Sequence, residues 1–280
     1  MQIPKIPLGE GIEYIINFLV DHCAFATKAM SVGLEAGLDV LEDGMLLIPP
    51  YIFIPVAAAL AWYLSKSKRT GLLTLFGLLL IWNIGLWKAT VSTIALVLIA
   101  TLIAIIIGVP LGIGAAMSRH MHKTVMPILD VMQTMPAFVY LIPAIPFFGL
   151  GKVAAIFSTV IFAMPPAIRL TCLGIKQVPG ELTECAEAFG SNRWQRLFKL
   201  ELPLATPTIM AGVNQTVMLA LSMVVIAAMI GAKGLGGEVW KAIQRLQMGN
   251  GFEAGIGIVI VAMILDRVLQ RIGKRKTETR

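Results

Sequence analysis

The sequence predicts an all-α membrane protein, built as a polytopic bundle of transmembrane helices. Of its 280 residues, 57% are hydrophobic and only 14% are charged. The mean hydropathy is +0.82, whereas soluble domains average roughly 45–50% apolar and about 25% charged residues. The apolar residues also gather in long runs, and most of these reach the roughly 17–25 residues that a helix needs to cross a bilayer. The chain therefore consists mostly of membrane spans.

The first 45 residues differ from the rest because they contain many acidic side chains. Ile12, Ile15 and Leu19 nevertheless recur at helical spacing among the acids. A helix with one apolar and one charged face lies in the plane of a membrane surface. Residues 1–45 are therefore predicted to form an external amphipathic segment.

Seven runs with few or no charges follow, and each is predicted to span the membrane: 46–64, 71–87, 89–117, 125–151, 153–175, 207–231 and 248–268. The first two, within residues 46–88, are predicted as peripheral helices, and residues 89–272 as the transmembrane core. Little more than Trp87 and Lys88 separates the second run from the third. A single broken helix, or a re-entrant pair, is the alternative there. The seventh run is the weakest because charged residues interrupt it.

The distribution of basic residues predicts the orientation. Cytoplasmic connections contain an excess of Lys and Arg, and placing the loop 178–206 inside puts 16 of the 23 basic residues on the cytoplasmic side. The amino terminus is then outside and the carboxyl terminus inside the cell membrane, the inner membrane where a cell has two. The basic tail, 273–280, is expected to lie on anionic lipid of the inner leaflet. The net charge of +7 follows from this bias, so no nucleic-acid partner is predicted.

One polar stretch between two apolar runs, residues 184–203, reads ECAEAFGSNRWQRLFKLELP. Good helix formers fill 181–189, Gly190 suits a left-handed stop, and Ser191 or Asn192 can cap a second helix. Leu182, Ala186 and Phe189 would lie on one face of the first helix. The stretch thus predicts a helix pair with an apolar ridge in water, although a loop that merely packs on its own bundle is the simpler alternative.

The spacing of this stretch resembles the EAA signature of ABC-importer permeases, with Cys185 and Leu200 as mild departures from the usual Ala and Ile. In that family the loop docks on a cytoplasmic ABC ATPase subunit. The resemblance implies an ATPase-coupling role for six residues: Glu184, Ala186, Gly190, Leu200, Leu202 and Pro203.

The chain itself contains no phosphate-binding G-x-x-x-x-G-K-[ST] motif. We predict no catalytic residue, no metal site and no cofactor in this chain. ATP and Mg²⁺ would belong to a separate ATPase.

Prolines crowd the fourth and fifth runs, and broken helices in a bilayer are tolerated where protein or a water-filled cavity satisfies the freed backbone groups. Kinks made only for packing are the alternative. The residues predicted to line a translocation pathway are Gln133, Thr134, Pro136, Phe138, Tyr140, Pro165, Pro166 and Asn214. Charges inside the membrane are costly, so Asp130 and Arg169 are predicted to form a structural ion pair.

Over residues 90–269, and most clearly at 129–151, 160–179 and 202–236, the chain resembles the permease subunit of glycine betaine/proline betaine ABC importers. The resemblance implies import of compatible solutes (osmoprotectants) by alternating access. The resemblance also implies these partners: a second permease copy, ATPase subunits, an extracellular or periplasmic solute-binding protein and membrane lipid.

Two other functions stay open at this point. Similar permeases carry choline, proline or histidine. A secondary carrier driven by an ion gradient would instead place several carboxylates or histidines at mid-membrane, and the runs contain few of them.

Overall fold

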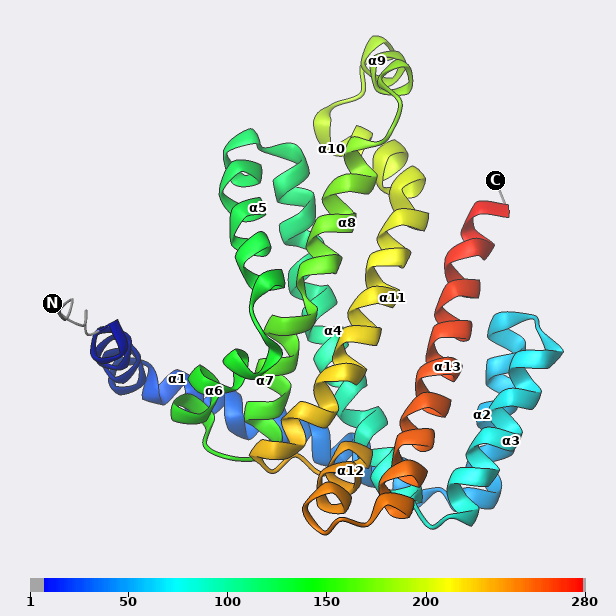
Figure 1. The fold of residues 1–280 in the computed structure, drawn as a ribbon. Coiled ribbons are helices and arrows are strands. Elements are labelled where there is room, and N and C mark those ends of the chain that lie inside the picture. Colours follow the sequence, from blue (N-terminus) through cyan, green and yellow to red (C-terminus); the bar gives the residue numbers. More distant parts are fainter. Residues whose placement is uncertain (1–7, 279–280) are drawn as a thin grey trace, which may run out of the picture.

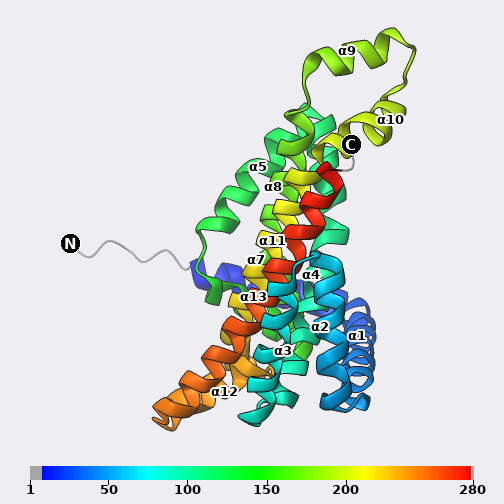
Figure 2. The ribbon, with the colours of Figure 1, turned by 90° about the vertical axis from the view of Figure 1, so that its right-hand side faces the viewer.

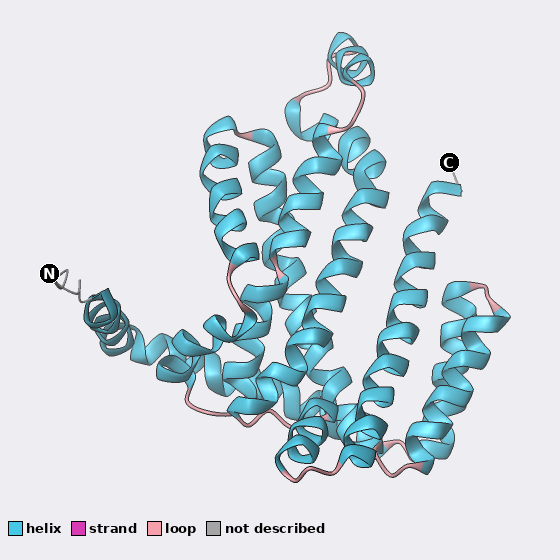
Figure 3. Cartoon of the chain, viewed as in Figure 1, coloured by secondary structure: helices cyan, strands magenta, loops and turns pink. Residues whose placement is uncertain are grey.

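The protein is described here from a computed structural model that places residues 8–278, and every regular element in that range is a helix (Figure 3). Residues 1–7 of the predicted external segment and residues 279–280 of the predicted basic tail lie outside the described residues. The helices and helical turns are α1 (Leu8–Leu47), α2 (Pro50–Ser65), α3 (Lys68–Asn83), α4 (Trp87–Met117), α5 (Arg119–Thr134), η1 (Ala137–Tyr140), α6 (Leu141–Phe148), α7 (Lys152–Ala163), α8 (Pro165–Lys176), α9 (Gly180–Ala188), α10 (Arg193–Arg196), η2 (Leu197–Glu201), α11 (Leu202–Ala227), η3 (Ala228–Ile230), α12 (Leu235–Gln244) and α13 (Met248–Glu278).

The centre of the bundle is formed by α4, by α7 with α8, and by α11, which pack side by side (Figure 1). Small residues allow this packing. A Cβ atom on Gly112 of α4 would lie 2.6 Å from the carbonyl oxygen of Ile168, and one on Gly212 of α11 would lie 3.0 Å from the carbonyl oxygen of Pro166. Helices in membranes associate through such small-residue contacts because lipid supplies no hydrophobic drive between them.

A second group, α2, α3 and α13, stands beside the centre (Figures 1 and 2). The connection 84–86, with Gly85 at φ +78°, separates α3 from α4. The two are therefore distinct helices running in opposite directions, and the single broken helix considered from the sequence is excluded. The start of α3 and the end of α13 point toward the same end of the bundle as α9 (Figure 1).

Seven runs were predicted to span the membrane, but fewer helices are both long enough and apolar enough to do so. In the described residues three do: Trp87–Met117, Lys152–Lys176 and Arg193–Ile230. Two more are counted if each of two sharply bent helix pairs is one span, Thr27–Leu47 with Pro50–Ser65 and Arg119–Thr134 with Ala137–Phe148. The runs at 71–87 and 248–268 do form helices, α3 and α13, but these fall short of the test, so their crossing stays a prediction.

The run at 125–151, which the prolines crowd, is not one straight helix. The chain bends by 113° between α5 and the η1–α6 segment. Pro136 explains the break, because it has no N–H to donate to the carbonyl of Met132 four residues earlier. The hydroxyl of Tyr140 donates a hydrogen bond to that carbonyl instead. The bend therefore leaves the freed acceptor satisfied.

Pro165 and Pro166, expected to break the fifth run, interrupt it far less. Both stand in the first turn of α8, where missing N–H groups cost least. Met164 keeps helical dihedral angles and joins α7 to α8. The two helices thus form one span of 25 residues, Lys152–Lys176.

The end of the bundle opposite α9 carries α1, α6 and α12 (Figure 1). Lys152 at the start of α7 holds α1 there, with Nζ 2.8 Å from Asp39 Oδ1 and 3.1 Å from Glu42 Oε2. Glu42 also accepts a hydrogen bond from Ser92 on α4. One carboxylate on α1 is thus bound by two helices of the central group.

Replacing this lysine tests whether the ion pairs hold α1. Lys152→Met leaves the largely buried Glu42 without its cation, so we expect backbone amides of 38–45 to exchange roughly tenfold faster, equivalent to about 1.4 kcal/mol. Hydrogen exchange read by mass spectrometry measures this. Lys233→Met is the matched control, since Lys233 is exposed. Equal exchange in both variants would show that the ion pairs of Lys152 do not hold α1.

Candidate functional site

The polar stretch 184–203 forms an arm that extends beyond the ends of the other helices (Figures 1 and 2). Its first part is α9, and the predicted left-handed stop follows it: Gly190 has φ +79°. The N–H of Ser191 donates to the carbonyl of Ala186 at 3.0 Å, and that of Gly190 to Glu187 at 2.8 Å. This pair of bonds is the Schellman motif, which satisfies carbonyls at a helix end. The helix α9 therefore ends at this turn.

The second part begins at Asn192, which caps α10. Its side chain accepts from the N–H of Gln195 at 2.8 Å, and the Gln195 side chain accepts from the N–H of Asn192 at 2.9 Å. The helix then continues without a stop as Arg193–Ile230, 38 residues long. A π-helical turn, Leu197–Glu201, stands just before Pro203, where the regular hydrogen-bond pattern lacks a donor. The predicted second helix is therefore not a separate short element but the extension of a membrane span.

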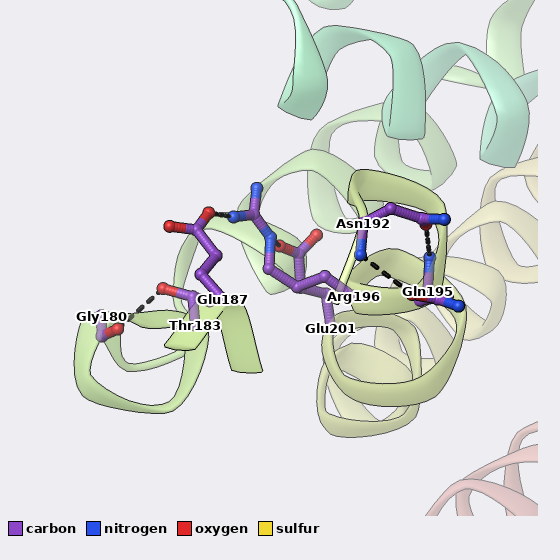
Figure 4. Close-up of polar contacts among 7 residues, drawn as sticks. All are labelled: Gly180, Thr183, Glu187, Asn192, Gln195, Arg196 and Glu201. Atoms are coloured by element: carbon purple, nitrogen blue, oxygen red, sulfur yellow. Dashed lines mark hydrogen bonds and ion pairs between the residues drawn. The ribbon is translucent and has the colours of Figure 1, made fainter. Parts of the chain in front are cut away.

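Arg196 ties the two parts of the arm together (Figure 4). Its Nη1 pairs with Glu187 on α9, and its Nε lies 2.8 Å from Glu201 Oε1 at the end of η2. The Glu201 side chain is only 11% exposed. A carboxylate so buried needs a partner, because removing the partner leaves an uncompensated charge. Arg196 therefore connects α9 to the helix that enters the membrane.

Sequence reasoning missed this contact and treated Arg196 only as one of the cytoplasmic cations. A signal was present. Arg196 and Glu201 are five residues apart, a spacing that a regular α-helix does not bring together but that one π-helical turn does. Because a regular helix was expected over 193–203, the sequence did not indicate that Arg196 could contact both Glu187 and Glu201.

Large apolar side chains are exposed on the arm. The loop apolar surface comprises Leu182, Phe189, Trp194 and Phe198. Phe189 is 87% exposed, and the rings of Trp194 and Phe198 stack with centroids 6.1 Å apart. Of the predicted ridge, Leu182 and Phe189 are exposed, and Ala186 is half-buried. Aromatic side chains gathered on a projecting element indicate a contact surface for another protein.

The remaining predicted coupling residues face the bundle. Leu200, Leu202 and Pro203 are half-buried. Leu202 packs against a small core of Ile175, Leu197 and Ala205, which joins α8 to the start of α11. Glu184, in contrast, is exposed and forms no ion pair within the described part of the chain. The six residues therefore divide between the tip of the arm and its attachment.

The predicted pathway residues do not share one site in a single chain. Gln133, Thr134, Pro136 and Phe138 are exposed around the α5–η1 break. Tyr140, Pro165 and Pro166 are buried inside the bundle. Asn214 belongs to a third place, because its Nδ2 donates to Asp266 Oδ1 on α13 at 2.8 Å. Only the first group is exposed as a whole.

Asp130 and Arg169 lie side by side, with Arg169 Nη2 2.5 Å from Asp130 Oδ1. The pair joins α5 to α8 near the bend that follows α5. Both side chains are partly exposed, at 65% and 38%. The geometry fits the structural role expected from the sequence.

Charge reversal tests that role. Asp130→Arg and Arg169→Asp should each reduce transport, because each places two like charges together where an attractive pair joined α5 to α8. The double reversal should recover most of the loss by restoring an attractive pair. Uptake into proteoliposomes measures this, with protein amount in the membrane as the control. Equal damage in the double variant would contradict the ion-pair role.

The described side chains contain no group of three His, Cys, Asp or Glu residues that could hold a metal ion.

Comparison with known proteins gives a consistent result. Residues 108–277 match the family model described as "Binding-protein-dependent transport system inner membrane component". The chain is 50% identical over 275 residues to the glycine betaine transport system permease protein OpuAB of Bacillus subtilis, covering 98% of this chain and 97% of that one. It is 48% identical to the glycine betaine/proline betaine transport system permease protein ProW of Escherichia coli, covering 96% of this chain and 76% of ProW.

The fold also resembles a solved structure. An inward-facing form of the MetNI methionine ABC transporter superposes with a TM-score of 0.61 over 68% of this chain and 94% of that one, at 21% identity. At that identity the likeness concerns the fold alone. From the family match and the close relatives, this chain belongs to the binding-protein-dependent transport system inner membrane components.

Proposed function

We propose that this chain is the permease subunit of an ATP-driven importer of glycine betaine or proline betaine, and that a separate cytoplasmic ATPase binds its projecting arm. The observation that carries the proposal is the arm itself, with its capped turn, its Arg196 contacts and its loop apolar surface. The names of the two relatives at about half identity support the solute class. ATP and Mg²⁺ would be bound by the ATPase, and this chain would supply no catalytic group.

The arm explains how motion would reach the membrane. ATPase closure would move α9, and Arg196 would pass that motion to the helix Arg193–Ile230, which is continuous into the bundle. Leu202 and its core would carry the displacement to α8. Access to the solute would alternate as these helices tilt, with the arm on the cytoplasmic side, the amino terminus outside and a binding protein delivering solute there.

The exposed face of α5 favours a pair of permeases. Ile128, Val131 and Phe138 are more than half exposed beside Gln133 and Thr134. A polar pathway next to open apolar surface would be enclosed if a second copy covered that face. We therefore propose a homodimer with the pathway between the two copies.

Reconstitution tests the proposal. The chain, purified with its co-expressed ATPase in lipid vesicles, should show ATP hydrolysis stimulated by a betaine-loaded binding protein, together with uptake of labelled glycine betaine. Choline, proline and histidine are the competing solutes to be offered with their own binding proteins. Stimulation by one of those instead would overturn the solute assignment. Uptake driven by an ion gradient without any ATPase would overturn the importer mechanism.

A further inference from the structure

A polar pocket lies between α3 and α13, away from the arm and from the predicted pathway. Its volume is about 370 Å³. Three arginines line it, Arg69 from α3 and Arg267 and Arg271 from α13, together with Ser67, Thr70 and Gln270. Within the described part of the chain none of the three arginines forms an ion pair. Three cations around one cavity repel one another unless an anion lies between them.

The packing of α3 on α13 holds Arg69 and Arg267 at one level, with Arg271 one turn further along α13. The two helices touch at Gly77, where an added Cβ would lie 2.6 Å from Ile260 Cγ2. The two helices run in opposite directions. From the contact at Gly77 and Ile260, Arg69 on α3 and Arg267 on α13 therefore both lie toward the α9 end. At 1.5 Å per residue these lie about 12 and about 10 Å from the contact. The pocket is therefore built by the tertiary packing of two helices and not by one flexible segment.

The carboxylate next to Arg267 in the sequence is already engaged. Asp266 precedes Arg267 in α13, but its oxygens accept hydrogen bonds from Asn214 and Gln270, at 2.8 Å for Oδ1 in each case. It does not line the pocket. The positive charge of the three guanidinium groups thus stays available for a ligand, and planar guanidinium groups match phosphate oxygens in pairs.

Aromatic side chains near the pocket indicate that it lies close to a membrane interface. Exposed Trp62 and Tyr63 mark the same end of α2, as aromatic residues do at membrane interfaces. Beyond the pocket, Leu72 and Phe76 leave exposed apolar surface on α3, along which an acyl chain would lie.

We propose that this pocket binds the phosphate group of an anionic phospholipid from the leaflet at the α9 end of the bundle. The arginines hold the phosphate oxygens, and the apolar face of α3 holds an acyl chain. A bound lipid then bridges the peripheral helix α3 to α13. Free inorganic phosphate shares the headgroup chemistry but lacks the chain, so the two are separable by experiment.

Native mass spectrometry of the full-length chain, purified with its partner subunits, measures retained lipid. From phosphatidylglycerol nanodiscs we expect one retained lipid per permease, and from phosphatidylcholine nanodiscs none. Arg69→Gln with Arg267→Gln should weaken phosphatidylglycerol retention by about tenfold or more, because two charge-assisted contacts are lost. The matched control, Arg119→Gln with Lys123→Gln, removes the same charge at the same end and should retain the lipid.

Two further measurements keep the result decisive. Arg69→Lys keeps the charge but loses the two parallel hydrogen bonds of a guanidinium group, so it should retain lipid at an intermediate level. Normal elution of each variant on size exclusion verifies that it is folded. Equal retention by the pocket and control doubles would overturn the site. Binding of inorganic phosphate that displaces phosphatidylglycerol at comparable concentration would overturn the lipid assignment.

Discussion

Replacing Gly190 by valine is expected to abolish most solute uptake and most ATPase stimulation while leaving the protein in the membrane. Gly190 has φ +79°, a conformation that costs an L-residue about 1–2 kcal/mol and suits a β-branched one least. A Cβ at Gly190 meets nothing within 4 Å, so the effect arises from the backbone alone. The Schellman turn would relax and α9 would lose its fixed direction. ATP-driven uptake in proteoliposomes measures the loss.

Gly190→Asn is the matched control. Asparagine adopts the left-handed conformation more readily than other L-residues, and the open surroundings accept its side chain. It should therefore keep a large part of the uptake that valine loses. If valine and asparagine reduced uptake equally, bulk at the ATPase contact would be the cause, and the backbone explanation would fail. Normal uptake in the valine variant would count against any coupling role for this turn.

Replacing Arg196 by glutamine is expected to produce the second large effect. It removes both ion pairs of the arm and leaves Glu201, whose side chain is 11% exposed, without a partner. An unsatisfied buried charged group costs about 1–3 kcal/mol or more. We expect ATPase stimulation to fall severalfold and α9 to become more sensitive to proteolysis, measured on the same purified complex.

A double substitution separates positioning from simple loss of charge. Arg196→Gln with Glu201→Gln removes the buried carboxylate as well, so stability should return toward that of the parent chain. Coupling should not return, because Glu187 on α9 still lacks its contact. Full recovery of uptake in the double variant would show that Arg196 serves only to neutralise Glu201.

The arm was predictable in outline because its residues act locally. Helix formers, a glycine and an asparagine in sequence determine a helix, a left-handed turn and a cap, and each of these depends on neighbours within five residues. Leu182 and Phe189 could also be placed on the surface from helical spacing alone. The contact between Arg196 and Glu187 could not, since it depends on how two helices meet across a turn.

The bend after α5 shows a similar division. Pro136 indicated a weak point, but neither the 113° angle nor the hydrogen bond from Tyr140 to the carbonyl of Met132 follows from the sequence pattern. The paired prolines Pro165 and Pro166 gave an equally strong signal and produce almost no break, because they begin a helix. Proline content alone does not distinguish these outcomes.

By itself, the sequence determined that this protein is a helical membrane protein with a polar loop between two apolar runs, because hydropathy, charge bias and turn residues are properties of short segments in a given solvent. Only the tertiary structure decided which side chains meet. It joined Arg196 to two carboxylates, Asn214 to Asp266, and Arg69 to the arginines of α13. Contacts between distant segments depend on helix packing at small residues such as Gly77 and Gly112, where tenths of an ångström set the register.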